Sequence, residues 1–383
     1  MQILLLLQYY ILSTAAALVF LYIVAYFYSH YGIQNKCKED RDIKNKNIIV
    51  TGGTAGIGKE VVKTLYLKGA VLIFTGRSIK KAKSLISELQ VLLKKKLKKG
   101  AGSQDDLKTK LKDLESGTWD NQQNFDSKFL KFRVIDQASL AQVRQFTEWV
   151  KANFSSLDTL HCNAGLVSQT EKKTEEGFDL AMGVSHFSHY LMVHDLLDLL
   201  KATPESRVVT TTSEAQKGPN HSTHIDLEDF HLENSDKPYD PFQGYFRSKL
   251  ANVLFTVGLN HFFKQEGLQI KAVSLHPGIV RTEFLRDMKG ALLVIYTILC
   301  PIWWDCVEGS QTSLFCILAE WSKLKSGEYY QRSEVGEMNK RGRNAMYWME
   351  FWNVCKREMK KKAGIECAKF KEFTQHHHEH HHE

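Results

Sequence analysis

From Asn47 onward, short runs rich in β-branched residues alternate with amphipathic stretches long enough to form helices. Such alternation indicates strands connected by helices. The six predicted strands are Ile48–Thr51, Val71–Thr75, Phe129–Ile135, Leu157–Cys162, Arg207–Thr212 and Ile270–Leu275. Parallel strands need crossover connections, and these crossovers are right-handed. The pattern therefore predicts an α/β protein with a doubly wound parallel sheet and helices on both of its faces.

The composition is that of a globular chain, with 383 residues of which 43% are hydrophobic and 25% charged. Its seven cysteines contain no Cys-x-x-Cys pair, which argues against a disulfide framework or a zinc ribbon and favours a reducing compartment. The net charge is +8, but the segment from Lys80 to Lys112 holds 11 lysines and three acidic residues. Because the rest of the chain is about neutral, we expect no nucleic-acid partner.

An uncharged segment opens the chain. The 26 positions from Ile3 to Tyr28 carry no charge, and a membrane-spanning helix needs about 20. Met1 to Tyr10 lacks the basic residues of a cleaved signal peptide, so we expect an uncleaved single-pass anchor. The basic residues that follow the anchor favour a cytosolic location for the rest of the chain. The membrane that holds the anchor is expected to be that of the endoplasmic reticulum or of another organelle. The basic residues are Lys36, Lys38, Arg41, Lys44 and Lys46.

These patterns divide the chain into an anchor (1–31), a basic linker (32–46), an α/β domain (47–335) and a C-terminal helix with a His-rich tail (336–383). Within the domain, residues from about 94 to 127 form a basic insertion, interpreted either as a solvated loop or as a contact for anionic lipid headgroups. Four aromatic residues at helical spacing predict that the C-terminal helix packs on the body or the membrane. They are Tyr347, Trp348, Phe351 and Trp352. The histidines after Gln375 lack a second ligand set, and we expect no metal site.

The first predicted strand runs into a glycine-rich turn, Thr51-Gly52-Gly53-Thr54-Ala55-Gly56-Ile57-Gly58, and a helix-like stretch follows from Lys59 to Lys68. Glycines permit positive φ and a close approach of the backbone to a ligand, and a helix N-terminus attracts a pyrophosphate. A turn in this context predicts a dinucleotide site in a Rossmann-like sheet. The candidate residues of the turn are Gly52, Thr54, Gly56, Ile57 and Gly58.

The spacing Thr-Gly-x-x-x-Gly-x-Gly resembles the short-chain dehydrogenase/reductase family, and four further matches follow in order. They are Asn163-Ala164-Gly165 after the fourth strand, Ser213 after the fifth, Tyr245-Phe246-Arg247-Ser248-Lys249 on a helix, and His276-Pro277-Gly278-Ile279-Val280-Arg281-Thr282 after the sixth. The resemblance covers about Lys46 to Tyr330. The phrases Val273–Phe284 and Glu308–Ser313 are similar to the retinol dehydrogenase-like branch in particular.

The resemblance implies a wider set of cofactor-binding residues. Besides the glycine turn, they are Asp136, Asn163, Ala164, Gly165, Tyr245, Lys249, Pro277, Gly278, Val280 and Thr282. Asp136 could equally cap a helix that begins near Ser139. At the end of the second strand stands Arg77, where an acidic residue would select NAD. A guanidinium can pair with a 2′-phosphate, so the sequence favours NADP(H) over NAD(H), unless Arg77 merely starts the next helix.

Tyr245 and Lys249 are four residues apart, and on a helix they would lie on one face. A free tyrosine titrates near pH ~10, so a neighbouring ammonium is needed to support proton transfer near neutrality. The resemblance assigns proton transfer to Tyr245, contact with the nicotinamide ribose to Lys249, and polarisation of the substrate oxygen to Ser213. Residues 210–213 all carry a hydroxyl group. If the match to the family were shifted by one position, the role of Ser213 would fall to Thr212 instead.

One position departs from the family's pattern. Where the family usually presents an asparagine that holds a water in the proton relay, this chain has Ser185. A serine hydroxyl is shorter and makes fewer hydrogen bonds than a carboxamide. We therefore expect an impaired or differently connected relay. Nearby, His186 and His189 are interpreted as packing and hydrogen-bonding groups, and Cys162 as a small core residue.

The segment Ala291–Trp304 is strongly apolar but too short to cross a bilayer. It is interpreted as a buried helix over the site or as an interfacial segment, and either suits an apolar substrate. The resemblance implies a retinoid, a steroid or a fatty aldehyde or ketone, and it leaves dimerisation open. The expected function is that of a membrane-anchored NADP(H)-dependent oxidoreductase interconverting a carbonyl and an alcohol. The alternative, motivated by Ser185, is a catalytically weak dinucleotide-binding sensor or scaffold.

Overall fold

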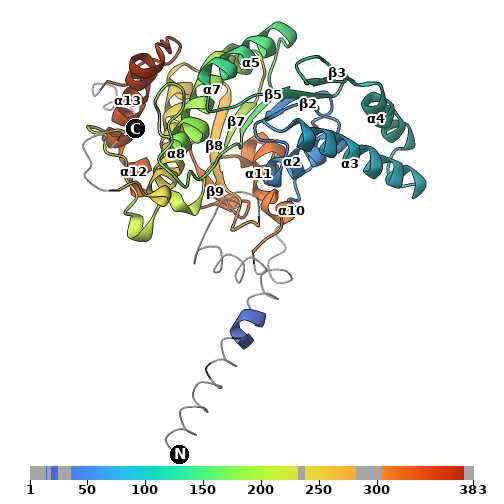
Figure 1. Ribbon diagram of the computed structural model, residues 1–383, viewed down its shortest axis with the longest axis horizontal. Coiled ribbons are helices and arrows are strands. Elements are labelled where there is room, and N and C mark those ends of the chain that lie inside the picture. The colour runs from blue at the N-terminus through green and yellow to red at the C-terminus, as the bar shows by residue number, and fades with distance from the viewer. Residues whose placement is uncertain (1–13, 15–18, 25–35, 232–237, 282–302, 375–383) are drawn as a thin grey trace, which may run out of the picture.

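The computed structural model describes residues 14, 19–24, 36–231, 238–281 and 303–374, and within them ten strands form one sheet in the order β10-β9-β8-β7-β6-β1-β2-β5-β4-β3 (Figure 1). In this spatial order, all neighbouring strands between β9 and β5 pair in parallel. These parallel strands are β1 Asn47–Val50, β2 Val71–Gly76, β5 Leu130–Val134, β6 Thr159–Cys162, β7 Ser206–Thr211, β8 Ile270–His276 and β9 Tyr329–Gln331. All six predicted strands are confirmed, with ends shifted by at most two residues.

The strand order reverses beside β1, which pairs with β2 on one side and with β6 on the other. Val50, its last residue, lies opposite Phe74 of β2 and His161 of β6. At such a reversal the connections leave toward opposite faces of the sheet, so a crevice opens outside the carboxyl ends of the strands. The glycine turn follows β1 directly and therefore stands at this crevice.

Helices cover both faces of the sheet, as the alternation predicted (Figure 1). Ile49 belongs to the core under α5, α7, α8 and α13, whereas its neighbours Ile48 and Val50 belong to the core under α2, α3 and α11. This division follows from the two-residue period of a strand. The helices are α2 Gly56–Leu67, α3 Ile79–Lys98, α5 Leu140–Asn153, α6 Leu180–Met182, α7 Ser188–Lys201, α8 Pro241–Gln265, α10 Cys306–Gly309, α11 Gln311–Leu318, α12 Lys340–Arg343 and α13 Ala345–Ala363.

The basic insertion is folded, and its interpretation as a solvated loop is wrong. Residues 94–98 complete α3, and the rest forms α4 (Gln104–Ser116) and an antiparallel pair, β3 (Thr118–Trp119) and β4 (Phe125–Asp126), that extends the sheet beyond β5. The buried Asp113 carboxylate holds the unit together by accepting hydrogen bonds from the Tyr66 and Ser127 hydroxyls at 3.2 and 2.7 Å. One buried acceptor with several donors suffices to fix a short polar segment.

The predicted C-terminal helix is α13, and it packs on the body. Trp348, Phe351 and Trp352 are buried in the same core as α8, and Trp352 stacks on Phe255 with ring centroids 5.8 Å apart. The remaining strand, β10 (Glu334–Val335), pairs antiparallel with β9 at the edge of the sheet.

Several expectations fall on residues outside the described part of the chain. They concern most of the anchor, Thr282, Ala291 to Ile302, and the histidine tail. Among the residues that are described, no helix has the length and apolar character required to cross a bilayer.

Candidate active site

The glycine turn is closed by close contacts that only glycine allows. Gly52 and Gly56 have φ of 65° and 56°, in the left-handed region. A Cβ on Gly58 would lie 2.5 Å from the Gly52 carbonyl oxygen and 2.6 Å from Asn163 Nδ2. The turn, the first residues of α2 and the segment after β6 are thus packed backbone to backbone. This arrangement leaves the amino end of α2 facing the crevice, where its N–H groups can bind phosphate.

A buried hydrogen-bond network joins the start of the glycine turn to the segment after β6 and to α7. Thr51 Oγ1 accepts from the backbone N–H groups of Asn163 and Ala164 at 2.9 and 3.0 Å and lies 2.9 Å from His189 Nε2. His189 Nδ1 lies 3.0 Å from the Ser185 carbonyl oxygen, so it carries the proton of the ring. Burial lowers the pKa of His189 to about 3, so the ring is neutral. His189 is therefore a hydrogen-bonding group, as the sequence indicated.

The predicted catalytic side chains meet at the carboxyl end of β7. Tyr245 and Lys249 lie on one face of α8, with Lys249 Nζ 5.5 Å from the centre of the Tyr245 ring. The Ser213 hydroxyl hydrogen-bonds the Tyr245 phenol. Thr212, the alternative to Ser213, is buried and donates its hydroxyl to the Lys249 carbonyl oxygen at 2.6 Å. The geometry therefore brings Ser213, and not Thr212, to the tyrosine.

Burial controls the protonation of this pair. Burial raises the pKa of Tyr245 to about 12, although the Ser213 hydrogen bond opposes the shift. Lys249 is 3% exposed, and burial lowers its pKa to about 8. Near neutral pH the phenol is therefore protonated, and the lysine beside it is a cation close to its own pKa. A protonated phenol next to a cation can deliver a proton to an oxygen that develops negative charge.

Ser185 joins this group from an irregular stretch. Residues Gly183–Phe187 form a π-helical turn between α6 and α7, and such turns are frequent at functional sites. A Cβ on Gly165 would lie 3.0 Å from Lys249 Nζ and 3.1 Å from Ser185 Oγ, so the two side chains converge on the space that this glycine leaves open. The Ser185 hydroxyl is buried and has no hydrogen-bond partner among the described residues.

Arg77 and Asp136 stand at the other end of the crevice, beyond β2 and β5. The guanidinium lies 3.7 Å from the Asp136 carboxylate, and the Arg77 side chain is exposed whereas that of Asp136 is half-buried. Asp136 also accepts from the Ala138 N–H at 3.0 Å, so it closes a turn, and the residue that precedes α5 is Ser139. Thr54 of the glycine turn packs against Gly76, one residue before Arg77. Turn and arginine are thus neighbours.

The segment that follows β8 forms a further part of the crevice wall at the carboxyl edge of the sheet. Gly278 has φ of 91°, and a Cβ there would lie 2.4 Å from the Trp304 ring. A Cβ on Gly309 would lie 2.5 Å from Val280 Cγ2 and 3.3 Å from Ile57 Cγ1, so Val280 packs near the start of α2. Pro277 is buried at the end of β8. The matching motif residue Thr282 lies outside the described residues.

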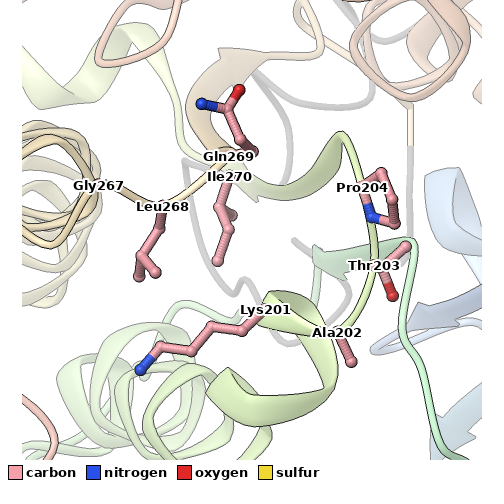
Figure 2. A pocket seen from close by; sticks show the side chains of 8 residues that line it. All are labelled: Lys201, Ala202, Thr203, Pro204, Gly267, Leu268, Gln269 and Ile270. Atoms are coloured by element: carbon pink, nitrogen blue, oxygen red, sulfur yellow. The ribbon is translucent and has the colours of Figure 1, made fainter.

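A cavity of about 350 Å³ lies away from this site (Figure 2). Its walls are the segment Lys201–Pro204, which precedes β7, and the segment Gly267–Ile270, which leads into β8. Leu268 and Ile270 point into the space between the two segments (Figure 2). The cavity is therefore at the amino edge of the sheet, opposite to the candidate active site.

Two residues of the site's supporting network, Thr51 and Gln137, were not predicted from the sequence. Gln137 Nε2 donates to Ser188 Oγ at 2.8 Å and lies 3.0 Å from His189 Nε2. Thr51 offered a signal, since it opens the glycine motif. Gln137 offered none, because its role depends on a contact across 52 positions of sequence.

The chain is similar in sequence to known proteins over most of its length. The family model described as short chain dehydrogenase matches residues 46–106 and 107–224. Human retinol dehydrogenase 12 is 30% identical over 335 residues, covering 88% of this chain and 93% of its own length. Human retinol dehydrogenase 13 is 30% identical, covering 77% of this chain and 78% of its own length.

Solved structures share the fold. A Mycobacterium paratuberculosis protein of uncharacterised function superposes with a TM-score of 0.59 at 21% identity, covering 84% of this chain and 95% of its own. A short chain dehydrogenase from Burkholderia cenocepacia, solved in complex with NADP, superposes with a TM-score of 0.51 at 19% identity, covering 76% of this chain and 97% of its own.

Proposed function

Since the chain belongs to the short-chain dehydrogenase/reductase family, with retinol dehydrogenases as relatives over most of its length, we propose that it transfers a hydride between NADP(H) and a carbonyl or alcohol carbon of a lipophilic substrate. Family and relatives make it an NAD(P)-dependent oxidoreductase that acts on alcohols. The observation that carries the proposal is the meeting of Tyr245, Lys249 and Ser213 beside the glycine turn.

The residues of the crevice fit a dinucleotide. The glycine turn leaves a helix N-terminus open toward it, and the buried Ser185 hydroxyl lacks a partner among the described residues. Within the described part of the chain, the one hydrogen bond of Lys249 Nζ is a long one, 3.4 Å, to the Thr211 carbonyl oxygen, which leaves donors for a ribose. We assign the pyrophosphate to the glycine turn and the nicotinamide ribose to Tyr245 and Lys249, with Asn163, Ala164, Gly165, Pro277, Gly278, Val280 and Thr282 lining the rest. When bound, the nicotinamide supplies or accepts the hydride.

The protein's own contribution is to hold the substrate oxygen and move its proton. In reduction, the Ser213 hydroxyl orients the carbonyl oxygen, and the Tyr245 phenol donates its proton to that oxygen as negative charge develops there. The Lys249 ammonium favours the resulting phenolate by its charge. Ser185, beside Lys249, is placed to connect the lysine to water. In alcohol oxidation each proton moves in the reverse direction.

The function is tested by NADPH and NADH oxidation with the full chain in detergent, using a panel of retinoid, steroid and aliphatic aldehydes and ketones. We expect turnover with NADPH and an apolar carbonyl substrate. Tight NADPH binding without turnover across the whole panel would favour the sensor or scaffold alternative, for which the unusual Ser185 is the supporting observation.

The cofactor preference is tested at Arg77. Its pairing with Asp136 is long and partly exposed, and such pairs contribute little, so the guanidinium is free to turn to a 2′-phosphate. We expect Arg77→Gln to raise the Kd of NADPH by about tenfold to a hundredfold, as loss of a charged hydrogen bond would, and to leave the Kd of NADH unchanged. Fluorescence titration measures both constants, and Lys112→Gln is the control for lost surface charge. Equal weakening of both cofactors would refute the NADP(H) assignment.

The relay is tested by a series at Ser185. We expect kcat to rise in the order Ser185→Ala, parent, Ser185→Asn, because each step adds hydrogen-bonding groups beside Lys249. We expect kcat to differ by roughly tenfold between the slowest and the fastest variant. This is less than the contribution of a complete general acid–base catalyst, because the relay only assists Tyr245. NADPH affinity should stay constant, which separates a proton relay from a disturbed cofactor site. Identical kcat values across the series would show that position 185 takes no part in proton transfer.

Membrane anchoring and a lipophilic substrate belong to the same proposal. Residues 19–24 of the uncharged segment are helical and expose Val19, Phe20, Leu21, Ile23 and Val24, which supports burial in lipid. We propose a division into four parts: the anchor at 1–31, the linker at 32–46, the catalytic domain with its folded insertion at 47–335 on the cytosolic side, and the C-terminal helix and His-rich tail at 336–383.

A further inference from the structure

The chain enters the folded domain at one corner of the sheet's carboxyl edge. The Cys37 N–H donates to Gln311 Oε1 at 2.9 Å, at the start of α11. Two residues later the Glu39 carboxylate accepts from Lys323 Nζ at 3.0 Å, beyond the other end of α11. The segment after Cys37 thus runs along α11 toward the amino edge of the sheet. Cys37 is therefore fixed at the corner between α10 and α11.

The residues that flank the segment 282–302, whose second half is apolar, lie at the same corner. Arg281 is the last described residue before residues 282–302, and its N–H donates to the Trp304 carbonyl oxygen at 2.8 Å. Cys306 Sγ contacts the Arg281 carbonyl oxygen at 3.5 Å, and Gln311 Nε2 donates to the Val307 carbonyl oxygen at 2.6 Å. One chain of contacts thus links Cys37, through Gln311, to the residues that flank this stretch. Its second half, residues 291–302, contains no charged residue.

Two exposed apolar side chains lie at this corner, next to the exposed charged residues Arg281 and Asp305. Ile279 is 62% exposed and Val307 is 53% exposed, and Trp304 bonds to the Ile279 carbonyl oxygen at 3.0 Å between them. In the described part of the domain, large apolar side chains with such exposure are few, the others being Val91, Val335 and Met346. Single apolar side chains scattered over a surface need no explanation. Apolar side chains that lie together, next to the ends of apolar segments, indicate a contact surface.

The number of residues between the uncharged segment and Cys37 limits how far this corner can be from a bilayer. Eight residues, 29–36, separate the end of the uncharged segment from Cys37. Fully extended, they reach at most about 28 Å, at roughly 3.5 Å per residue. Because Cys37 is fixed at the corner, the corner must stay within that distance of the membrane surface, whatever the rest of the domain does.

We propose that the corner formed by Ile279 and Val307 rests on the lipid bilayer. The inference rests on the proposed function, since it takes the anchor and the lipophilic substrate from there. The corner adjoins the glycine turn at the edge of the crevice, because Val280 and Ile57 both pack at Gly309. A substrate dissolved in the bilayer then reaches the crevice directly from the lipid, without crossing bulk water.

Photolabelling of the full chain in vesicles tests the contact. The probe is a phosphatidylcholine carrying a diazirine near the top of one acyl chain, and labelled peptides are identified by mass spectrometry. We expect lipid adducts on the peptides that contain Ile279 and Val307 and on the anchor, and none on the peptide that contains Val91. Val91 is the matched control because it is 66% exposed but lies on α3, away from the corner.

The outcomes separate this inference from the proposed function. Adducts on the anchor but on neither corner peptide would overturn the membrane-facing corner and leave the anchor standing. Absence of adducts on the anchor would overturn both. Labelling of the Val91 peptide as strong as that of the corner peptides would show unspecific contact, and would also overturn the proposal.

A charged double variant gives a second readout. In Ile279→Glu/Val307→Glu we expect loss of corner labelling to the level of the Val91 peptide, with anchor labelling retained. Where turnover is measurable, its KM should rise for a long-chain aldehyde dissolved in the vesicles and stay constant for a short, water-soluble aldehyde and for NADPH. Val91→Glu should change none of these. A double variant that is labelled and turns over like the parent would refute the proposal.

Discussion

Replacing Tyr245 by phenylalanine is expected to abolish turnover while leaving the dinucleotide bound. The substitution keeps the ring on α8 and removes only the hydroxyl that meets Ser213. Because the pKa of Tyr245 is raised to about 12, the phenol is protonated near neutral pH and can serve as the acid that we propose. Loss of a positioned acid lowers kcat by about 10²- to 10⁴-fold. Steady-state NADPH oxidation measures kcat, and fluorescence titration measures the Kd of NADPH, which we expect to change little.

Tyr239 provides a matched control. Its hydroxyl donates to the Ser168 carbonyl oxygen at 3.1 Å, and burial raises the pKa of Tyr239 to about 12 as well. Tyr239→Phe therefore removes a phenol of similar pKa from the same part of the chain and should keep most of the parent's kcat. If Tyr245→Phe retained the parent's turnover, the acid–base role of Tyr245 would be excluded.

The second large effect is expected at the glycine turn, where Gly58→Ala should eliminate dinucleotide binding. The added methyl would lie 2.5 Å from the Gly52 carbonyl oxygen and 2.6 Å from Asn163 Nδ2, and a backbone carbonyl cannot move without changing the turn. We expect the Kd of NADPH to rise by at least about a hundredfold, the loss of two or more charged hydrogen bonds to phosphate. Isothermal titration calorimetry measures this change.

The control for Gly58→Ala is Gly244→Ala, where the nearest atoms to a new Cβ are at an ordinary 3.5 Å. Melting curves with and without saturating NADPH separate a misfolded variant from a folded one that cannot bind, because a ligand raises the melting temperature only of a protein that binds it. A cooperative unfolding transition at a lower temperature than the parent's, because the clash strains the turn, with no shift by NADPH, is the expected result. A shift as large as the parent's would contradict the role of the turn.

The fold was largely predictable because its strands carry their own signal. Fully buried parallel strands such as Val71–Gly76 are continuous apolar runs, and the glycine turn marks the switch from strand to helix. Strand β9, with three residues, and β10, with two, are too short to show any period. The lysines of the insertion concealed α4, since its apolar positions are few and its fixing contact, Asp113 with Ser127, lies in the tertiary structure.

The sequence alone determined the local chemistry. Spacing placed Tyr245 and Lys249 on one helix face, and the glycines at 52, 56 and 58 predicted a backbone that approaches a ligand. The tertiary structure decided which distant groups meet. It favoured Ser213 over Thr212, brought Ser185 to Lys249 across the open side of Gly165, and attached the linker at Cys37 beside the cofactor edge. The physical reason is that period and turn chemistry act within a few residues, whereas burial, pKa and contact depend on elements that folding alone brings together.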